Sequence, residues 1–219
     1  MSNKKVYMFV PPSHDWGMPL IALPLLKACI PQSIECKIID INVDIFNYIW
    51  GKEYLDCLKK SIRGYLDNND MLSSVNSSID LEKKILFKEI GDREYVLSRK
   101  IHIIDEWYDS NKVHDFLMSE SQTEKILELL IENYNLDDAK AFAISIGVED
   151  QIVLSFVLMK ILKKKFLRIP IILGGNIVSR LADNLYKSKL RKYFDTLIVG
   201  EGEISLPSIL DKIVNNLNP

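Results

Sequence analysis

Two short runs rich in β-branched residues, each ending in glycine, place the strongest constraint on the fold of this 219-residue chain. The first is Ile171-Ile172-Leu173-Gly174-Gly175-Asn176, and the second closes the stretch 194–203 with Val199-Gly200-Glu201-Gly202-Glu203. A segment of helical character separates them, so the pattern predicts two parallel strands joined by a helix. Because ligands of open parallel sheets bind outside the carboxyl ends of the strands, the two glycine turns mark the expected functional rim.

The rest of the chain continues this alternation of strands and helices. Strands are predicted at Lys5–Val10, Cys36–Ile41, Ala141–Ile146, Ile169–Leu173 and Asp195–Val199. Helices are predicted at Gly17–Ile30, with a kink at Pro24, and at Gln151–Lys165, Ile177–Leu190 and Ile204–Leu217. We therefore expect an α/β fold, a Rossmann-like doubly wound sheet of five parallel strands, in one domain that spans residues 1–219.

The segment from about residue 43 to residue 138 interrupts the alternation, since it is far longer than a plain crossover. Apolar residues at helical spacing favour a helix in Ser121–Tyr134, and the polar piece Asp67–Ser78 is expected to be a loop. We expect a helical insertion between the second and third strands, located on the carboxyl rim of the sheet. Its aromatic residues are interpreted mainly as packing residues.

Composition and charge disfavour several functional classes. The formal net charge is −2 without a basic tract, which disfavours nucleic acid, and no segment approaches the roughly 18 apolar residues of a membrane span. The apolar run near Met1 is too short for a signal peptide. Cys29, Cys36 and Cys57 fit neither a disulfide framework nor a metal motif. A cytoplasmic protein with no nucleic-acid and no membrane partner is therefore expected.

The turns after the predicted strands exclude the common nucleotide and hydrolase motifs. Pro11–Gly17 stands where a dinucleotide site needs Gly-x-Gly-x-x-Gly, and neither a P-loop nor a Gly-x-Ser-x-Gly elbow occurs. The strand ends also lack the acids and the lysine of a phosphoacceptor receiver domain. A flavin mononucleotide carrier is a weaker alternative, because the first loop lacks a hydroxyl-rich phosphate cradle. The kind of ligand that these exclusions leave is a large flat or elongated molecule that lies along the glycine-lined strand ends.

Five motifs follow the predicted strands in order: a proline pair, Asp40-Ile41-Asn42, Ser145-Ile146-Gly147, Gly174-Gly175 and Gly200-Glu201-Gly202-Glu203. This order resembles the cobalamin (B12)-binding domain at the amino end of many radical S-adenosylmethionine enzymes, of the type that matures peptides. Related domains hold the corrin ring over the carboxyl rim and thread the nucleotide tail into the flank of the sheet. The resemblance implies a cobalamin cofactor, held for methyl transfer or another radical reaction.

The resemblance also implies roles for single residues. Gly174 and Gly175 would let the backbone approach the tail without a Cβ clash, and Ser145 would offer it a hydroxyl. His14 keeps a spacing that supplies a cobalt ligand in some related domains, but Pro12 stands where an aspartate would orient that histidine. We interpret His14 as an exposed loop residue, with cobalt ligation as the alternative. The implied cofactor-binding set is Pro12, His14, Gly17, Ser145, Gly147, Gly174, Gly175, Asn176, Gly200, Glu201 and Gly202.

Catalysis is not expected from this chain alone. Radical S-adenosylmethionine enzymes hold a four-iron four-sulfur cluster with Cys-x-x-x-Cys-x-x-Cys, which this sequence lacks. The cluster and S-adenosylmethionine are therefore expected only in a separate catalytic domain or subunit, and Glu201 and Glu203 are interpreted as a rim residue and a helix-cap acid. An alternative of another class is a degenerate module that binds a precursor peptide or a partner subunit without cobalamin.

Overall fold

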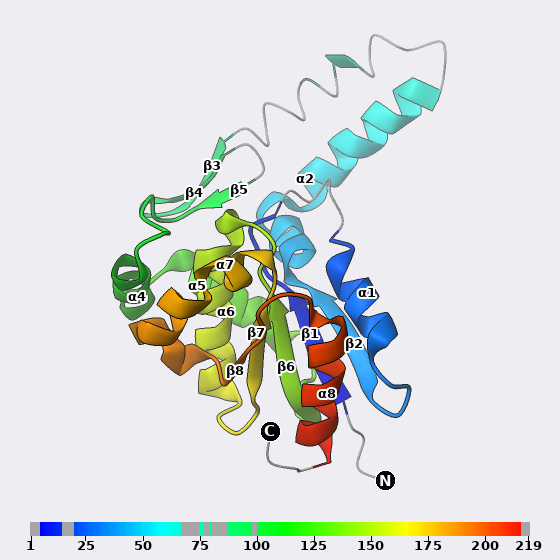
Figure 1. The fold of residues 1–219 in the computed structure, drawn as a ribbon. Helices are drawn as coiled ribbons and strands as arrows, with labels where there is room; N and C mark the ends of the chain where they lie inside the picture. The colour runs from blue at the N-terminus through cyan, green and yellow to red at the C-terminus, as the bar shows by residue number, and fades with distance from the viewer. Residues whose placement is uncertain are drawn as a thin grey trace.

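A five-stranded parallel sheet forms the centre of the protein, with the spatial strand order β2-β1-β6-β7-β8 (Figure 1). The computed structural model describes residues 5–14, 20–66, 75–76, 79, 87–97 and 100–215, and of residues 52–55, 57–58 and 60–66 the backbone only. The strands are β1 (Lys5–Val10), β2 (Glu35–Asp40), β6 (Ala139–Ser145), β7 (Ile171–Gly174) and β8 (Thr196–Leu197). The predicted α/β fold with five parallel strands is confirmed.

Helices cover both faces of this sheet. They are α1 (Ala22–Cys29), α2 (Ile41–Leu66), α4 (Ser110–Met118), α5 (Gln122–Glu132), α6 (Ile152–Lys165), α7 (Asn176–Lys187) and α8 (Gly202–Val214), with short helical turns η1 (Glu149–Gln151) and η2 (Lys189–Tyr193). The α1 and α8 helices pack on one face, and α5, α6 and α7 contribute to the core on the other. The sheet is therefore doubly wound, as predicted. No helix in the described ranges combines the length and the hydropathy needed to cross a membrane.

The start of the first helix differs from its prediction. The α1 helix begins at Ala22, so Pro24 is its third residue. Backbone N–H groups in the first turn of a helix have no intrahelical partner, and proline is therefore tolerated there. The kink predicted at Pro24 is wrong for this reason, and residues 15–19 of the predicted helix lie outside the described residues.

Side-chain size differs between the two faces of the central strand β6. Successive side chains of a strand point to opposite faces, so Phe142 and Ile144 share one face, and Ala141 and Ala143 share the other. On the first face, the Phe142 ring lies 5.8 Å from the ring of Phe9, measured between centroids. That face is filled by large side chains, whereas the face toward α1 and α8 has small side chains at its centre.

The predicted insertion is present between β2 and β6, and it contains strands as well as helices. Besides α2, α4 and α5, it carries an antiparallel three-stranded sheet of β3 (Phe87–Gly91), β4 (Glu94–Leu97) and β5 (Lys100–His102). A tight turn joins β3 to β4, and Arg93 in this turn has a φ of +60°. The sequence pattern does not indicate this sheet, because its strands are short and mix charged with apolar residues. The loop predicted at Asp67–Ser78 lies almost entirely outside the described residues.

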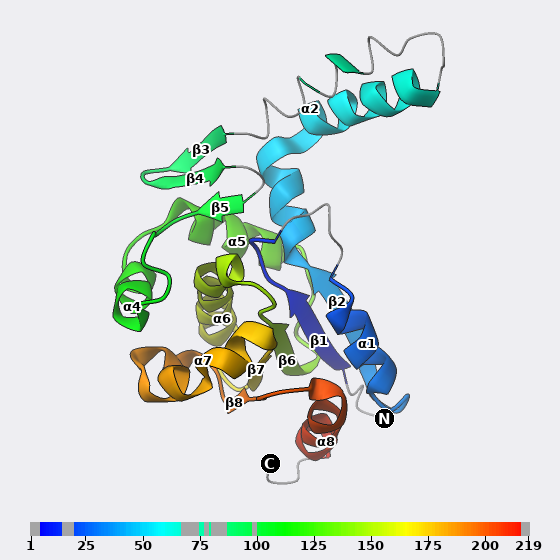
Figure 2. The same ribbon diagram turned by 45° about the horizontal axis from the view of Figure 1, so that its top comes forward.

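The insertion reaches the carboxyl rim of the main sheet, as expected. The backbone N–H of Ile101 in β5 donates a 2.7 Å hydrogen bond to the hydroxyl of Ser13, in the loop after β1. From the end of β2, α2 leads away from the main sheet, and its helical geometry is broken at Gly51, where φ is +53° (Figure 2). The antiparallel sheet is thus tied to the first loop of the rim.

A buried carboxylate joins the antiparallel sheet to α5. Glu94 of β4 is 5% exposed and accepts hydrogen bonds from the backbone N–H groups of Gln122 (2.9 Å) and Thr123 (2.6 Å) and from the Thr123 hydroxyl. These N–H groups belong to the first turn of α5, where a negative charge is favoured by the helix dipole. Glu94 therefore caps a helix that is distant from it in the sequence.

We expect Glu94→Ala to lower the free energy of unfolding by about 1–3 kcal/mol, because it leaves buried donors without acceptors. Glu89→Ala is the matched control, since Glu89 is an exposed residue of the adjacent strand β3. Chemical denaturation of both variants measures the difference. Equal effects of the two substitutions would contradict the capping role of Glu94.

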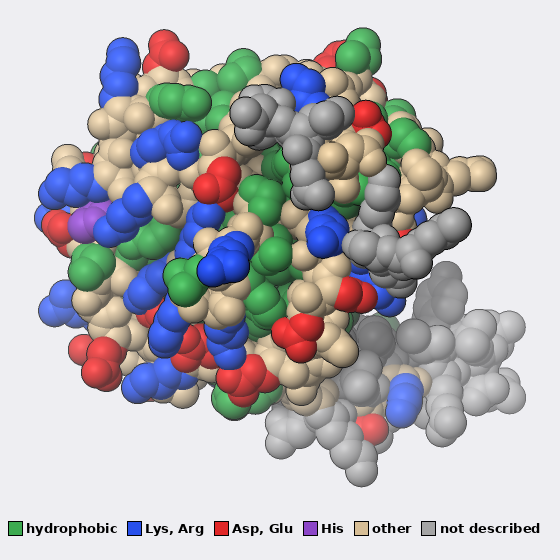
Figure 3. Space-filling model, turned by 90° about the horizontal axis from the view of Figure 1, so that it is seen from below, with side chains coloured by type: hydrophobic (Ala, Val, Ile, Leu, Met, Phe, Trp, Pro, Cys, Tyr) green, Lys and Arg blue, Asp and Glu red, His purple; other side chains and the backbone are tan. Residues whose placement is uncertain are grey.

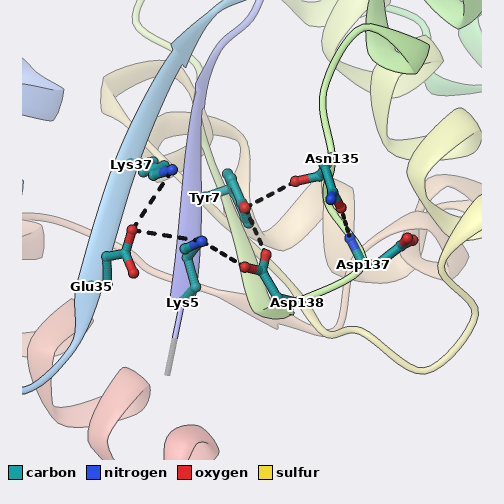
Figure 4. A network of polar contacts seen from close by, with 7 residues as sticks. All are labelled: Lys5, Tyr7, Glu35, Lys37, Asn135, Asp137 and Asp138. Carbon is teal, nitrogen blue, oxygen red and sulfur yellow. Dashed lines mark hydrogen bonds and ion pairs between the residues drawn. The ribbon is translucent and has the colours of Figure 1, made fainter. Parts of the chain in front are cut away.

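The amino end of the sheet is held by a polar network (Figure 4). The Tyr7 hydroxyl donates to a carboxylate oxygen of Asp138 at 2.7 Å and also lies 3.1 Å from the carbonyl oxygen of Asn135. The Lys5 ammonium lies 2.5 Å from the other Asp138 oxygen. Lys5 and Tyr7 lower the pKa of Asp138 through these hydrogen bonds. The network fixes the chain that enters β6 against β1. Figure 3, which views the molecule from this end, shows acidic and basic side chains interspersed over the surface.

The Tyr7 phenol makes stability depend on alkaline pH. Burial, with the hydrogen bond and the charge of Asp138, raises its pKa from 10.0 to about 12. Because the folded protein favours the neutral phenol, this contribution is present below pH 10 and is lost as the pH rises from 10 toward 12. In Tyr7→Phe, the decline of unfolding free energy over this interval should be smaller by on the order of 1 kcal/mol. Denaturation curves at several alkaline pH values test this, with the exposed Tyr108→Phe as a control that keeps the wild-type slope.

Candidate functional site

A cavity of about 440 Å³ lies between the small-residue face of the sheet and the helices α1 and α8. Residues of β1, β6, β7, α1, α7 and α8 line it, together with residues of the segments after β7 and β8 that include the two glycine turns at the carboxyl rim. Its volume falls within the roughly 300–1,000 Å³ that small-molecule sites occupy. We refer to it as the rim cavity.

Small side chains on the sheet make room for the rim cavity. Ala143 and Ser145 of β6 and Gly174 of β7 lie next to one another, because Ser145 pairs with Gly174 in the strand register. A Cβ atom at Gly174 would lie 3.6 Å from the Cβ of Ile198, within ordinary contact distance. The helices α1 and α8 close the other side of this space. The side chain of Leu26 in α1 lies close to Gly202 in α8, since a Cβ atom at Gly202 would be 2.9 Å from the Leu26 side chain.

The first glycine turn requires glycine at position 175. Gly175 has a φ of +113°, and a Cβ atom there would lie 2.3 Å from the carbonyl oxygen of Ile146. Hydrogen bonds also join this turn to the loop after β6. The Ile146 N–H donates to the Gly174 carbonyl (2.9 Å), and the Ile177 N–H donates to the Ile146 carbonyl (3.3 Å). Contact this close between two backbone segments is possible only without a side chain.

Ser179 fixes the second glycine turn to the first. Its hydroxyl accepts a 2.8 Å hydrogen bond from the N–H of Gly200 and donates one of 3.1 Å to the carbonyl of Gly175. Gly200 has a φ of +82°, a conformation that glycine adopts without strain. Ser179 is absent from the predicted site residues, and its place one turn after Gly175 in α7 is the only signal that the sequence offers for it.

Two buried amide side chains hold the loops on the other side of the rim. Gln151 is fully buried; its amide N–H donates to the Pro11 carbonyl at 2.7 Å, and its carbonyl oxygen accepts from the Gly147 N–H at 2.9 Å. Asn42 forms a pair of hydrogen bonds with the backbone of His14, of 2.9 and 3.1 Å. These amides connect the loops after β1 and β6 to each other and to α2.

The structure separates the predicted site residues into two groups. Those that line the rim cavity are Ser145, Gly174, Gly175, Asn176, Gly200, Glu201 and Gly202. Pro12, His14 and Gly147 are absent from its lining and belong to the loops that Gln151 and Asn42 hold. Gly17 lies outside the described residues. The motifs at the ends of β6, β7 and β8 thus converge on one cavity.

The apolar part of the cavity lining was not predicted. It includes Met8, Leu23, Ala143, Ile172, Ile198 and Leu206. The alternation of small and large residues in Ala141-Phe142-Ala143-Ile144-Ser145 is the sequence signal that could have indicated a hollow face on this strand. The remaining residues are ordinary core residues by sequence, and only the packing of α1 and α8 brings them to a cavity.

The polar groups of the rim cavity lie near its outer end. Asn176 and Ser179 belong to the first turn of α7, and Glu201 and Glu203 flank the start of α8. Ser145 also lines the cavity, and its hydroxyl has no hydrogen-bond partner among the described residues. This arrangement suits a ligand with a flat apolar part and a polar part that remains near the rim.

Metal ligands do not gather in the part of the chain that the structure describes. No group of three or more His, Cys, Asp or Glu side chains is arranged there to hold a metal ion. Burial raises the pKa of the Cys36 thiol to about 11, which keeps this thiol protonated near neutral pH. Cobalt ligation by His14 stays a prediction.

No protein-family model, curated protein or solved structure matches this chain. Its function is therefore inferred from the residues and the geometry of the rim cavity.

Gly175→Ala should lower the free energy of unfolding by about 1–3 kcal/mol, because the new methyl group overlaps the backbone of Ile146 and φ is positive. Gly147→Ala is the matched control, because its Cβ would meet the nearest atoms at 3.6 Å, an ordinary contact. Thermal or chemical denaturation of both variants measures the difference. A Gly175→Ala protein as stable as Gly147→Ala would show that the close backbone contact between Gly175 and Ile146 is not needed for stability.

Proposed function

We propose that this chain is a cytoplasmic cobalamin-binding module of a radical S-adenosylmethionine system. In this proposal it holds the cofactor over the carboxyl rim, and a separate catalytic domain or subunit carries the iron–sulfur cluster and S-adenosylmethionine. The observation that carries the proposal is the rim cavity, which connects the glycine turns at the ends of β7 and β8 with the hollow face of β6.

The shape of the rim cavity supports a divided mode of binding. A space of about 440 Å³ can receive the nucleotide tail of cobalamin, whereas the corrin ring would remain above the rim. Gly174 and Gly202 leave room at the entrance, since a side chain at either position would extend toward Ile198 or Leu26. Ser145 lines the cavity and would offer its hydroxyl to the sugar and phosphate part of the tail.

The residues that line the rim cavity are therefore compatible with the nucleotide tail of the cofactor. When bound, cobalamin supplies a cobalt centre that carries methyl groups. The protein would contribute a preformed cavity whose entrance is held by Gly175 and Ser179. Such an entrance orients a ligand without a large loss of conformational freedom on binding.

The alternative of a recognition module is favoured by aromatic side chains of the insertion. The rings of Tyr95 and His102 stack with their centroids 5.2 Å apart, and the Phe87 ring lies 5.7 Å from that of Tyr95. Phe87 is 53% exposed. This aromatic row (Phe87, Tyr95 and His102) would suit contact with a precursor peptide or a partner subunit.

Reconstitution with hydroxocobalamin, followed by desalting and a visible spectrum, tests the proposal. The wild-type protein should retain the corrinoid absorption. Gly174→Ala should weaken binding by about 10-fold or more, because it adds a methyl group at the cavity entrance. Gly147→Ala should bind as the wild type does, since it adds the same group at the same contact distance outside the cavity.

Two results would contradict the cobalamin proposal. One is a colourless wild-type protein after repeated reconstitution. The other is an equal loss of binding in the Gly174→Ala and Gly147→Ala variants, which would show that the rim cavity is not the site. The recognition module would then be supported if the chain binds a peptide, or a protein with the Cys-x-x-x-Cys-x-x-Cys motif, without cobalamin. Phe87→Ala should abolish this binding.

A further inference from the structure

The antiparallel sheet of the insertion has two edge strands, β3 and β5, and their outer edges differ. At β5, the backbone N–H of Ile101 donates to the hydroxyl of Ser13, so the loop after β1 covers this edge. At β3, no further strand is paired with the outer edge in the described ranges of the chain. The edge of β3 is therefore the open edge of this sheet.

The strand register fixes the direction of the backbone groups in β3. In an antiparallel sheet the N–H and C=O groups of one residue point to the same side, and successive residues alternate. Ile101 points away from β4, so its pair Val96 points toward β3, where it is paired with Lys88. The neighbours of Lys88 in β3, Phe87 and Glu89, therefore direct their N–H and C=O groups outward from the sheet.

These outward backbone groups are free to bind another chain. Among the described residues, none forms a hydrogen bond with the backbone of Phe87 or Glu89 on this outer side. Both residues are exposed, Phe87 by 53%. Donors and acceptors that are unpaired along an exposed edge strand are a template for one more strand.

The open edge is short. The register shifts between Glu89 and Gly91, and a Cβ atom at Gly91 would lie 2.7 Å from the Cβ of Gln122 at the start of α5. A strand added beside β3 must therefore end before Gly91. A short edge that ends in a bulge resists pairing with a whole sheet, but it leaves room for a few residues of extended chain.

The side chains beside the open edge are an aromatic ring and a carboxylate. Residues paired across strands share a face, so Phe87 and Glu89 lie on the same face as Tyr95 and His102 of the aromatic row. An open groove of about 420 Å³ is lined by Phe87, Glu89, Tyr95 and the turn between β3 and β4. Glu89 forms no ion pair within the described part of the chain. An added strand would meet the ring at one position and this carboxylate two positions away.

We propose that the open edge of β3 receives an extended peptide as a fourth strand, with an apolar side chain beside Phe87 and a Lys or Arg side chain beside Glu89. Antiparallel pairing, the pattern of the existing sheet, gives the peptide the order Lys/Arg-x-apolar. Backbone hydrogen bonds supply affinity in this mode of recognition, and alternate side chains supply selectivity. The inference goes beyond the cobalamin proposal and does not depend on it.

A second copy of this chain fits the open edge less well. A two-fold axis at the middle of the edge would place the two copies of Lys88 opposite each other and each Phe87 opposite a Glu89. Like charges directly opposite each other destabilise paired strands, and the ring would gain no apolar neighbour. These pairings favour a peptide of complementary sequence over a dimer.

A peptide with blocked ends, Thr-Thr-Lys-Val-Leu-Thr-Thr, is the probe for the full wild-type chain. In the proposed register, the N–H groups of its Lys and Leu point toward β3 and that of its Val points away. N-methylation of the Lys and Leu nitrogens should weaken binding by about 10-fold or more, because each loses a hydrogen bond. N-methylation of the Val nitrogen is the matched control and should preserve binding. Titration of a fluorescent label on the peptide measures the three dissociation constants.

Two variants of Glu89 separate the backbone contribution from the charge. Glu89→Pro removes an outward N–H, which an edge strand tolerates, so binding should be lost while the thermal unfolding temperature stays near that of the wild type. Glu89→Gln keeps the N–H and removes only the charge. It should bind the probe with the affinity that the wild type has for a probe carrying norleucine in place of Lys. Retention of hydroxocobalamin should be the same in both variants as in the wild type.

Three results would overturn the inference. The first is the absence of probe binding by the wild type up to about 1 mM. The second is an equal effect of N-methylation at the two kinds of position. The third is a wild-type dimer in sedimentation that Glu89→Pro converts to a monomer, because a second copy would then occupy the edge. A wild-type protein that binds the probe and retains no corrinoid would support the inference and contradict the cobalamin proposal alone.

Discussion

The alternation of side-chain size along β6 is the constraint on which the fold and the candidate site both depend. The large residues of this strand, Phe142 and Ile144, fill the core between the sheet and α6, where Phe142 contacts the rings of Phe9 and Phe166. The small residues, Ala143 and Ser145, leave the opposite face hollow beneath α1 and α8. One strand can do both because its side chains alternate between the two faces. Both faces of the sheet carry a buried hydrophobic cluster, and the cavity lies on the face with the small residues.

Close backbone contacts and hydrogen bonds connect the turns at the entrance of the cavity. Backbone contact between Gly175 and Ile146 joins the ends of β6 and β7, and the Ser179 hydroxyl adds the turn after β8. On the other side, the buried Gln151 amide joins the loops after β1 and β6. The side chains of Ser179 and Gln151 satisfy polar backbone groups that a turn would otherwise expose or leave unpaired. These contacts hold the strand ends together, an arrangement that would lower the entropic cost of binding a ligand.

The sequence predicts the parts of this structure that follow from local pattern. Buried runs of β-branched residues locate the five strands, and glycine at their ends locates the rim. Local pattern does not tell Gly147 from Gly175, two rim glycines of which only the second lines the cavity, because that difference arises from the neighbouring loop. It also misses the antiparallel sheet, whose strands are stabilised by distant contacts such as that of Glu94 with the start of α5. Ser179 and Gln151 belong to no recognised motif, since each also binds a distant partner, Gly200 for Ser179 and Pro11 for Gln151.

The rim cavity and the aromatic row, on which the two functional proposals rest, lie on different parts of the molecule. The cavity is lined from α1, α8 and the strands beneath them, whereas Phe87, Tyr95 and His102 belong to the antiparallel sheet of the insertion. The insertion is anchored at the rim by the hydrogen bond from Ile101 to Ser13 and contributes α4 and α5 to the core cluster on the opposite face of the main sheet. A ligand in the cavity and a macromolecule on the aromatic row would therefore occupy separate surfaces. The two proposals therefore concern different surfaces, so a result that contradicts one of them leaves the structural basis of the other unchanged.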